Sequence, residues 1–208
     1  MPLVIDISPV LDESIAVWPG DTPFARNVSL DIAAGANLTL SDMRTTLHVG
    51  AHADAPSHYV AGGDDIAARR LELYIGQCVV LHVNVNRGDR IRPMHIAGKA
   101  ITAPRVLFRT GTFPDPRNWN DDFASLSPEV IDALHGHGVV LVGIDTPSVD
   151  PFESKDLEAH RALAEYDMAN LEGLVLDAVP EGTYELIAAP LRIRGGDASP
   201  VRAVLRTL

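Results

Sequence analysis

The sequence is poor in cysteine and in basic residues, and each shortage excludes a class of protein. Its one cysteine, Cys78, cannot close a disulfide within the chain, which excludes a disulfide-stapled scaffold and fits a reducing compartment. Cys78 stands in the apolar run 78–81, so we expect a small buried side chain and not a reactive thiol. Lysine and arginine number 17 against 28 acidic residues, for a net charge of −11, and no run of five or more basic residues exists. Such a chain repels phosphate backbones, so a nucleic-acid partner is excluded.

Long hydrophobic runs are also lacking. The longest, around 139–144, is far short of the roughly 20 residues that a membrane-spanning helix needs. The first residues, 1–6, carry neither a positive segment nor a long apolar stretch, so no secretory signal is expected. These absences predict a cytoplasmic protein without a membrane partner.

What the chain has is enough apolar material for one core. It holds 208 residues, of which 46% are hydrophobic, so residues 1–208 are predicted to form a single domain. Two segments read as helices: Ser127–His135, with a capping serine and a proline at its first position, and Leu157–Tyr166. Seven short apolar, β-branched segments read as strands: Leu3–Ile7, Gln77–Val85, Val106–Phe108, Val139–Ile144, Leu174–Leu176, Tyr184–Ala188 and Val201–Leu205.

Because predicted strands outnumber helices, we expect an α/β fold with a mixed, partly antiparallel sheet. The segment Val139–Ile144 is apolar at every position, which is typical of a strand covered on both faces. Two stretches look irregular but carry unusual chemistry: the turn 18–21, Trp-Pro-Gly-Asp, and the segment 48–58. Function is therefore expected in these loops.

The segment 48–58 concentrates metal-binding side chains. Three of the eight histidines, His48, His52 and His58, lie within these 11 residues, together with Asp54. Imidazole and carboxylate are typical ligands of zinc or manganese. In a fully extended chain His48 and His52 would lie about 13 Å apart with parallel side chains, too far to share one ion. The chain is therefore predicted to bend, with Gly50 supplying the conformational freedom.

The remaining candidates are weaker on spacing alone. His160 lies inside the second predicted helix, and Glu172 occupies the turn before the predicted strand 174–176. Asp145 and Thr146 follow a buried strand, where α/β active sites often gather, but the sequence assigns them no role. The other four histidines are expected to be structural: His82, His95, His135 and His137.

The segment His48–His58 resembles the HxGTHxDxPxH signature of the metal-dependent cyclase/hydrolase family. The turn 18–21, the segment 143–148, and His160 with Glu172 agree with that resemblance. Within the family, the tryptophan of the turn and the run 52–59, HADAPSHY, are most similar to the bacterial kynurenine formamidases. Two positions depart: Ala51 stands where the signature has threonine, and Ser57 replaces a bulkier apolar residue.

The resemblance implies a compact swivelling β/β/α domain, a homodimer, and two divalent metal ions per subunit, zinc with manganese as the alternative. It implies that His48, His52 and Asp54 hold the first ion, and that Asp54 bridges to a second ion held by His160 and Glu172. His58 would act as the acid/base, and Trp18 would line the substrate pocket. The implied reaction is hydrolysis of N-formyl-L-kynurenine to L-kynurenine and formate, in tryptophan breakdown.

That chemistry is consistent with the residues present. A metal lowers the pKa of a bound water to about 7, so no serine or cysteine nucleophile is needed, and the chain has no Gly-x-Ser-x-Gly motif. Three alternatives stay open: His58 as a metal ligand, another aryl or cyclic amide as the substrate, and a metal-binding protein without turnover. The sequence does not identify the residue that recognises the amino-acid end of the substrate.

Overall fold

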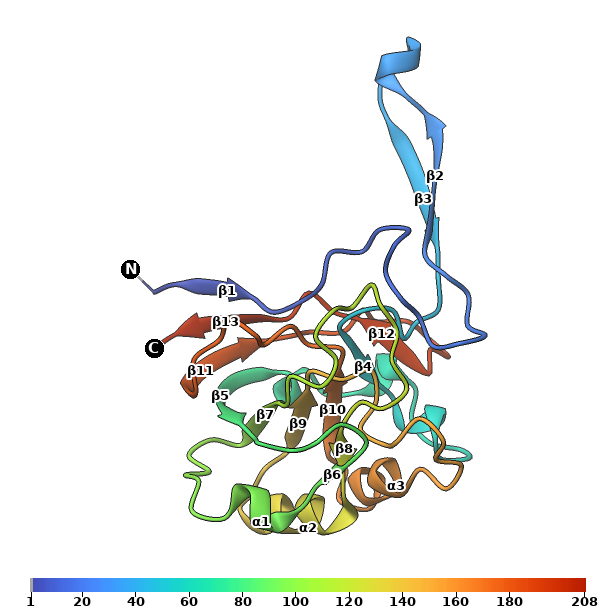
Figure 1. The fold of residues 1–208 in the computed structure, drawn as a ribbon. Helices are drawn as coiled ribbons and strands as arrows, with labels where there is room; N and C mark the ends of the chain where they lie inside the picture. The colour runs from blue at the N-terminus through green and yellow to red at the C-terminus, as the bar shows by residue number, and fades with distance from the viewer. Residues whose placement is uncertain (1) are drawn as a thin grey trace.

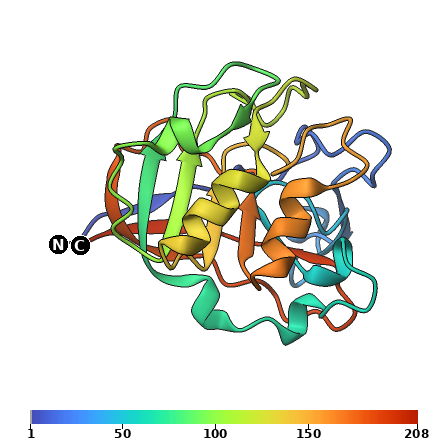
Figure 2. The ribbon, with the colours of Figure 1, turned by 90° about the horizontal axis from the view of Figure 1, so that it is seen from below.

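A curled mixed sheet of nine strands forms the centre of the computed structural model, which describes residues 2–208 (Figure 1). In order across the sheet the strands are β1 (Val4–Asp6), β13 (Val204–Thr207), β11 (Gly182–Ile187), β5 (Ile75–His82), β7 (Arg105–Arg109), β9 (Leu141–Ile144), β10 (Ala169–Glu172), β4 (His52–Asp54) and β12 (Ala198–Pro200). The four strands from β5 to β10 are parallel, and every other neighbouring pair is antiparallel. The predicted α/β class with a mixed, partly antiparallel sheet is thus confirmed. The pairing of β1 with β13 brings the chain ends side by side (Figures 1 and 2).

Two layers of apolar side chains cover the two faces of the parallel strands. Along β5, Cys78 and Val80 enter one hydrophobic cluster while Val79 and Leu81 enter the other, as the two-residue alternation of a strand requires. The second cluster is completed by two helices, α2 (Pro128–Gly136) and α3 (Glu158–Glu165). Figure 2 shows these two helices side by side over the sheet. Burial on both faces explains why β9 is apolar throughout.

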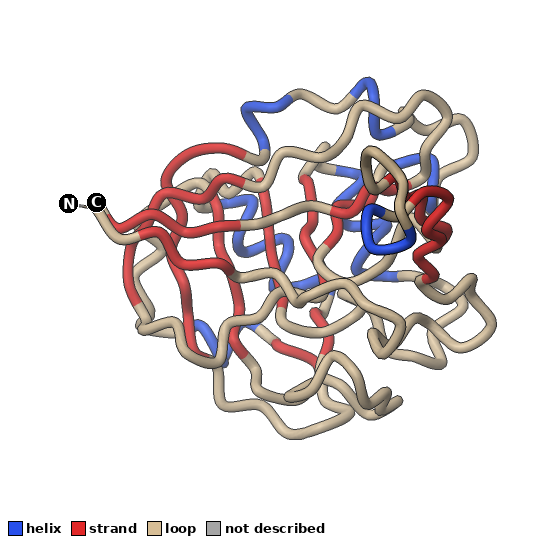
Figure 3. Tube along the Cα trace, turned by 90° about the horizontal axis from the view of Figure 1, so that it is seen from above, coloured by secondary structure: helices blue, strands red, loops and turns tan. Residues whose placement is uncertain are grey.

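Short elements fill the connections, which are mostly loop (Figure 3). A two-stranded parallel pair joins β6 (Arg90–Ile91) to β8 (Ser125–Leu126). The short helices are α1 (Pro93–Ile96), η1 (Ile32–Ala34), η2 (Pro56–His58), η3 (Ile66–Ala68) and η4 (Leu71–Leu73). None of the helices in residues 2–208 has the length and apolar character needed to cross a bilayer.

An antiparallel hairpin of β2 (Ala25–Leu30) and β3 (Leu40–Arg44) projects from the body of the molecule, with η1 at its tip (Figure 1). We call residues 25–44 the arm. Every residue of both strands is exposed. The arm was not predicted from the sequence, because its strands bury no face and so lack an apolar alternation.

Both predicted helices are confirmed, and Ser127 caps α2 by accepting a hydrogen bond from the Val130 N–H. Six of the seven predicted strands overlap observed ones, but the strand predicted at Leu174–Leu176 is wrong. The strand there is β10, which ends at Glu172, because Gly173 adopts a left-handed φ of +65°. Glu172 is therefore the last residue of a strand and not part of a turn. The segment 48–58 is also more regular than predicted, since it contains β4 and η2.

Candidate metal centre

Strands β4 and β10 supply four polar side chains from the same face of the sheet. Glu172 lies directly opposite His52 in the antiparallel register, and Leu171 opposite Ala53. Because side chains alternate along a strand, His52 and Asp54 share a face with Asn170 and Glu172, while Ala53 and Leu171 enter the core. The His52 Nε2 lies 3.2 Å from Glu172 Oε2, and the Asn170 amide donates to Asp54 Oδ2 at 2.7 Å.

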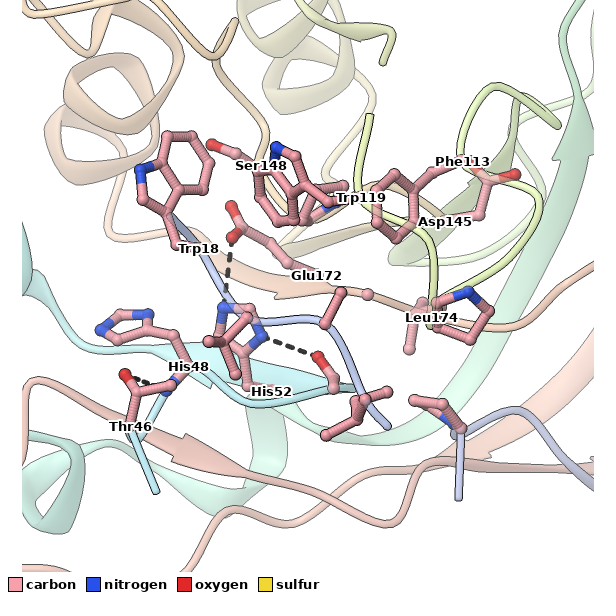
Figure 4. Close-up of a pocket in the computed structure, with 18 of the residues that line it drawn as sticks. Trp18, Thr46, His48, His52, Phe113, Trp119, Asp145, Ser148, Glu172 and Leu174 are labelled. Carbon is pink, nitrogen blue, oxygen red and sulfur yellow. Dashed lines mark hydrogen bonds and ion pairs between the residues drawn. The ribbon is translucent and has the colours of Figure 1, made fainter. Parts of the chain in front are cut away.

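The predicted bend at Gly50 is confirmed and brings His48 to His52. Gly50 has a φ of +59°, and the two imidazole rings lie 5.1 Å apart, far closer than in an extended chain. A Cβ on Gly173 would collide with the Gly50 carbonyl oxygen, so the close approach of the bend to the end of β10 requires glycine at position 173. A Cβ on Gly50 would instead meet the side chains of Leu11 and Pro9. The Gly50 carbonyl also lies 2.9 Å from His52 Nδ1 (Figure 4). This contact makes Nδ1 the donor and leaves the lone pair of Nε2 facing the carboxylates.

His160 reaches the same place from helix α3. Its Nε2 lies 3.2 Å from Asp54 Oδ2 and 3.4 Å from Glu172 Oε1, while its Nδ1 lies 2.8 Å from Asp150 Oδ2. Asp150 also accepts the backbone N–H groups of Ala159 and His160, so one carboxylate caps the start of α3 and orients the ring. Contacts of this kind behind a histidine are usual in metal sites, where they set the tautomer and the ring direction.

His48 and His58 form the solvent side of the cluster. The His48 Nδ1 lies 3.0 Å from Asp54 Oδ1, and its Nε2 lies 3.2 Å from Asp197 Oδ2. The His58 ring packs 4.2 Å from that of His48, with its Nδ1 3.6 Å from Asp197. Burial, together with repulsion from His48 and His160, lowers the pKa of His58. His58 is therefore mostly neutral at pH 7 and able to accept a proton.

The chemistry of this donor set fits divalent cations. Asp54 and Glu172 are both buried at 2–3% exposure, and two buried carboxylates side by side are costly without positive charge. His52 Nε2 and Asp54 Oδ1 are buried and make no well-directed hydrogen bond among the described residues, although Glu172 and His48 lie within 3.2 Å of them. Three sets of candidate ligand atoms lie within 4.8 Å of one another: His48, His52 and Asp54; Asp54, His160 and Glu172; and His48, His58 and Asp197. The first two sets share Asp54.

Contacts with imidazoles favour the charged form of the buried acids. Burial opposes ionisation of Asp54, but hydrogen bonds from His160 and His48 keep its pKa well below the usual range. Burial and the charge of Asp54 oppose ionisation of Glu172, and contacts with His160 and His52 lower its pKa. A bound cation would favour the charged carboxylates in the same direction.

A cavity of about 380 Å³ opens beside the cluster and is lined by aromatic rings (Figure 4). Trp18 lies 5.2 Å from Trp119 and 4.9 Å from Phe152, measured between ring centroids. Its turn has proline second and glycine third, with Gly20 at φ +100° and the Asp21 N–H bonded to the Trp18 carbonyl, as in a type II turn. Trp18 is half-buried against the cavity and is not a core residue.

The structure thus brings together all seven residues singled out from the sequence, although their roles remain predictions. It adds three that the sequence reasoning missed: Asp150, Asn170 and Asp197. Asn170 lies 116 residues from Asp54, and Asp197 lies 149 residues from His48, so no local spacing could reveal these two contacts. Asp150 lies only 10 residues before His160, but the two residues belong to no motif that the sequence analysis recognised. The four other histidines lie outside the candidate clusters found in residues 2–208, as expected: His82, His95, His135 and His137.

Comparison with known proteins agrees with this centre. The model of the Cyclase family matches residues 5–151. A structure described as a potential metal-dependent hydrolase with cyclase activity is 26% identical, covers 100% of this chain and 99% of its own, and superimposes with a TM-score of 0.86. A predicted metal-dependent hydrolase from Bacillus stearothermophilus is 28% identical over 99% of this chain and 98% of its own, with a TM-score of 0.84.

Isatin hydrolase A from Labrenzia aggregata, bound to benzyl benzoate, shares the fold at 24% identity and a TM-score of 0.85, over 99% of this chain and 94% of its own. The family match covers more than half of the chain and includes the segment 48–58. The chain therefore belongs to the Cyclase family and has the fold of its metal-dependent hydrolases.

Proposed function

We propose that the protein hydrolyses N-formyl-L-kynurenine to L-kynurenine and formate as a metal-dependent amidohydrolase. The observation that carries the proposal is the pair of histidine–carboxylate clusters, joined through Asp54, that borders an aromatic-lined cavity. An aryl formamide needs both parts: a polar centre for its formyl group and a flat apolar wall for its ring.

In this proposal His48, His52 and Asp54 hold one divalent ion, and Asp54, His160 and Glu172 hold a second. Each carboxylate oxygen of Asp54 belongs to a different cluster, since Oδ1 faces His48 and Oδ2 faces His160. Zinc suits this nitrogen and oxygen set, and manganese is the alternative. When bound, such ions lower the pKa of water and polarise a carbonyl oxygen.

His58 is the proposed acid/base. Its side chain lines the cavity and contacts His48 and Asp197 without reaching the buried carboxylates. As a neutral imidazole it can take a proton from the attacking water and deliver it to the departing aryl amine nitrogen. A ring nitrogen of His58 also lies within 4.8 Å of candidate ligand atoms of His48 and Asp197, so the alternative role of His58 as a metal ligand needs its own test.

The substitution His58→Ala separates the two roles. As an acid/base, His58 contributes about 10²- to 10⁴-fold to kcat, so the variant should keep its full metal content and lose most of its turnover of N-formylkynurenine. His137→Ala, on the exposed end of α2, is the matched control and should keep both. Loss of metal from His58→Ala would instead assign His58 as a ligand.

A second candidate substrate is a cyclic aryl amide. The isatin hydrolases share this fold, and one of them holds an aromatic ester, benzyl benzoate. Turnover of isatin but not of N-formylkynurenine would replace the proposed substrate with this class. Absence of turnover of either compound by metal-loaded protein would leave a metal-binding protein without hydrolase activity.

We also propose that the chain forms a homodimer through the arm. A lone two-stranded hairpin is only marginally stable in water, yet the arm exposes six large apolar side chains: Val28, Leu30, Ile32, Leu38, Leu40 and Met43. A second copy offers the same apolar surface, as a two-fold interface requires. Light scattering should give a dimer for the wild type and a monomer for Leu30→Lys with Leu40→Lys. A monomeric wild type, or a dimeric double variant, would contradict the proposal. We further propose that the protein is located in the cytoplasm.

A further inference from the structure

Several carboxylates line the cavity beside the metal centre. Among residues 2–208, no lysine or arginine side chain lines it. Five carboxylates do: Asp21, Asp145, Glu172, Asp177 and Asp197. N-formylkynurenine carries an ammonium and a carboxylate at its amino-acid end. The charges of the residues that line the cavity therefore determine which of these two groups it can recognise.

Most of these acids already have partners. Glu172 and Asp197 contact the histidine cluster, with Asp197 3.2 Å from His48 Nε2. Asp177 pairs with Arg109 at 3.3 Å, and Asp21 accepts a hydrogen bond from the Thr46 hydroxyl.

Asp145 differs because it combines burial, at 6% exposure, with the absence of an ion pair to any residue in 2–208. Its Oδ2 accepts the N–H groups of Thr110 and Gly111, both at 2.8 Å, whereas its Oδ1 accepts only the Thr110 hydroxyl at 2.7 Å. Oδ1 therefore retains acceptor capacity. Burial raises the pKa of Asp145 despite these hydrogen bonds, and a cation beside it would relieve that cost.

The rings around Asp145 favour the same kind of ligand. Phe113, which lies near Asp145 in Figure 4, and Trp119 line the cavity together. Their centroids are 5.7 Å apart. Aromatic faces attract ammonium groups and repel carboxylates.

We propose that Asp145 is a specificity residue that binds the ammonium group of the substrate, and that the pocket gives the substrate carboxylate no partner. The inference rests on the proposed hydrolysis of aryl amides and narrows it. The preferred substrates are aryl formamides with an amino group on the side chain, and a carboxylate on that side chain is dispensable. The amino-acid end is thus recognised through its positive charge.

Four formamides test this on the metal-loaded protein: N-formylkynurenine, its decarboxylated analogue with only the ammonium, its desamino analogue with only the carboxylate, and 2-formamidoacetophenone with neither. A charged hydrogen bond is worth about 10- to 100-fold in kcat/KM, so loss of the ammonium should cost that factor. Loss of the carboxylate should cost less than about threefold. A large loss with the decarboxylated analogue would overturn the inference, because it would require a cation that recognises the carboxylate.

The variant Asp145→Asn separates binding from a structural role, since Asp145 also anchors the loop that carries Phe113. If Asp145 binds the ammonium, the variant should lose the 10- to 100-fold preference while its turnover of 2-formamidoacetophenone stays within about threefold. An equal loss on all four compounds would show a structural role and refute the inference. Asp177→Asn is the control, because Arg109 already neutralises that acid, and it should keep the preference. If wild-type protein hydrolyses none of the four, the proposed function itself fails.

Discussion

Asp150→Asn tests whether the contacts behind His160 control metal affinity. Asp150 accepts four N–H groups: the backbone of Ala159 and of His160, both at 3.0 Å, the His160 ring at 2.8 Å, and the Arg90 guanidinium at 3.5 Å. Asparagine has nearly the same shape but only one acceptor oxygen and no charge. The variant can thus still cap α3 in part, but it no longer holds the ring with a charged hydrogen bond.

The expected loss follows from those contacts. Removal of a partner behind a ligating histidine typically lowers metal affinity 10- to 100-fold, which corresponds to about 1.4–2.7 kcal/mol. Weakened capping should cost about 1 kcal/mol of folding free energy, or a drop in Tm of about 2–4 °C for a chain of this size. The loss of metal-binding free energy should therefore exceed the loss of folding free energy.

Competition with a chromophoric chelator measures the affinity of metal-stripped protein for zinc. Asp65→Asn is the matched control, because Asp65 caps η3 by accepting the Ala68 N–H at 3.0 Å and does not touch the centre. An Asp150→Asn affinity within twofold of the wild type would refute the reasoning, since His160 would then not be a ligand that depends on Asp150.

The remaining predictions concern His48, Cys78 and Gly173. Burial lowers the pKa of His48, but hydrogen bonds with Asp54 and Asp197 outweigh it and raise that pKa from 6.5 to about 9 in metal-free protein. A metal ion must displace this proton, so the affinity for metal should increase from pH 6.5 to 9 and then level off, with proton release measured by calorimetry. An affinity that does not change with pH would contradict this prediction. The same proton stabilises metal-free protein below pH 6.5, and this stability should be lost as pH rises towards 9. Burial raises the pKa of Cys78 to about 12, so the thiol should react with Ellman's reagent at pH 8 only after unfolding, and rapid reaction of folded protein would show that it is accessible. Gly173→Ala places a Cβ against the Gly50 carbonyl and should lower the free energy of unfolding by about 2 kcal/mol or more, or the Tm by about 4–8 °C. Gly88→Ala is the control, because Gly88 has a similar positive φ but open space around it, and it should lower stability less. Equal losses of stability in the two variants would show that the close approach to Gly50 is not the cause.

The apolar strands and both longer helices could be predicted because their side chains pack into a core. Strand β9 is apolar at every position, and α2 carries a capping serine followed by proline. Strand β10 was missed because it is not apolar throughout: Asn170 and Glu172 alternate with apolar residues and point into the metal centre. The apolar run 174–176 is buried but extends no strand; its N–H groups at Leu174 and Val175 bond to the carbonyls of Ile144 and Ile7. Hydrophobicity there indicated burial and not secondary structure.

The residues of the candidate site also differ in how far the sequence could predict them. The histidines of the segment 48–58 are close in sequence, so their clustering could be seen before the fold was known. His160 and Glu172 could be added only through resemblance to a family, because the sheet and α3 bring them to Asp54 across more than 100 residues. Asp150 and Asp197 contact the histidines by tertiary packing alone. The charge of the pocket wall likewise depends on which side chains the fold turns inward.

Metal content measured together with turnover tests the central claim most directly. Purified protein should contain two divalent ions per chain, lose hydrolysis of N-formylkynurenine when a chelator removes them, and recover it when zinc or manganese is restored. Undiminished hydrolysis by protein shown by elemental analysis to hold no metal would contradict the account.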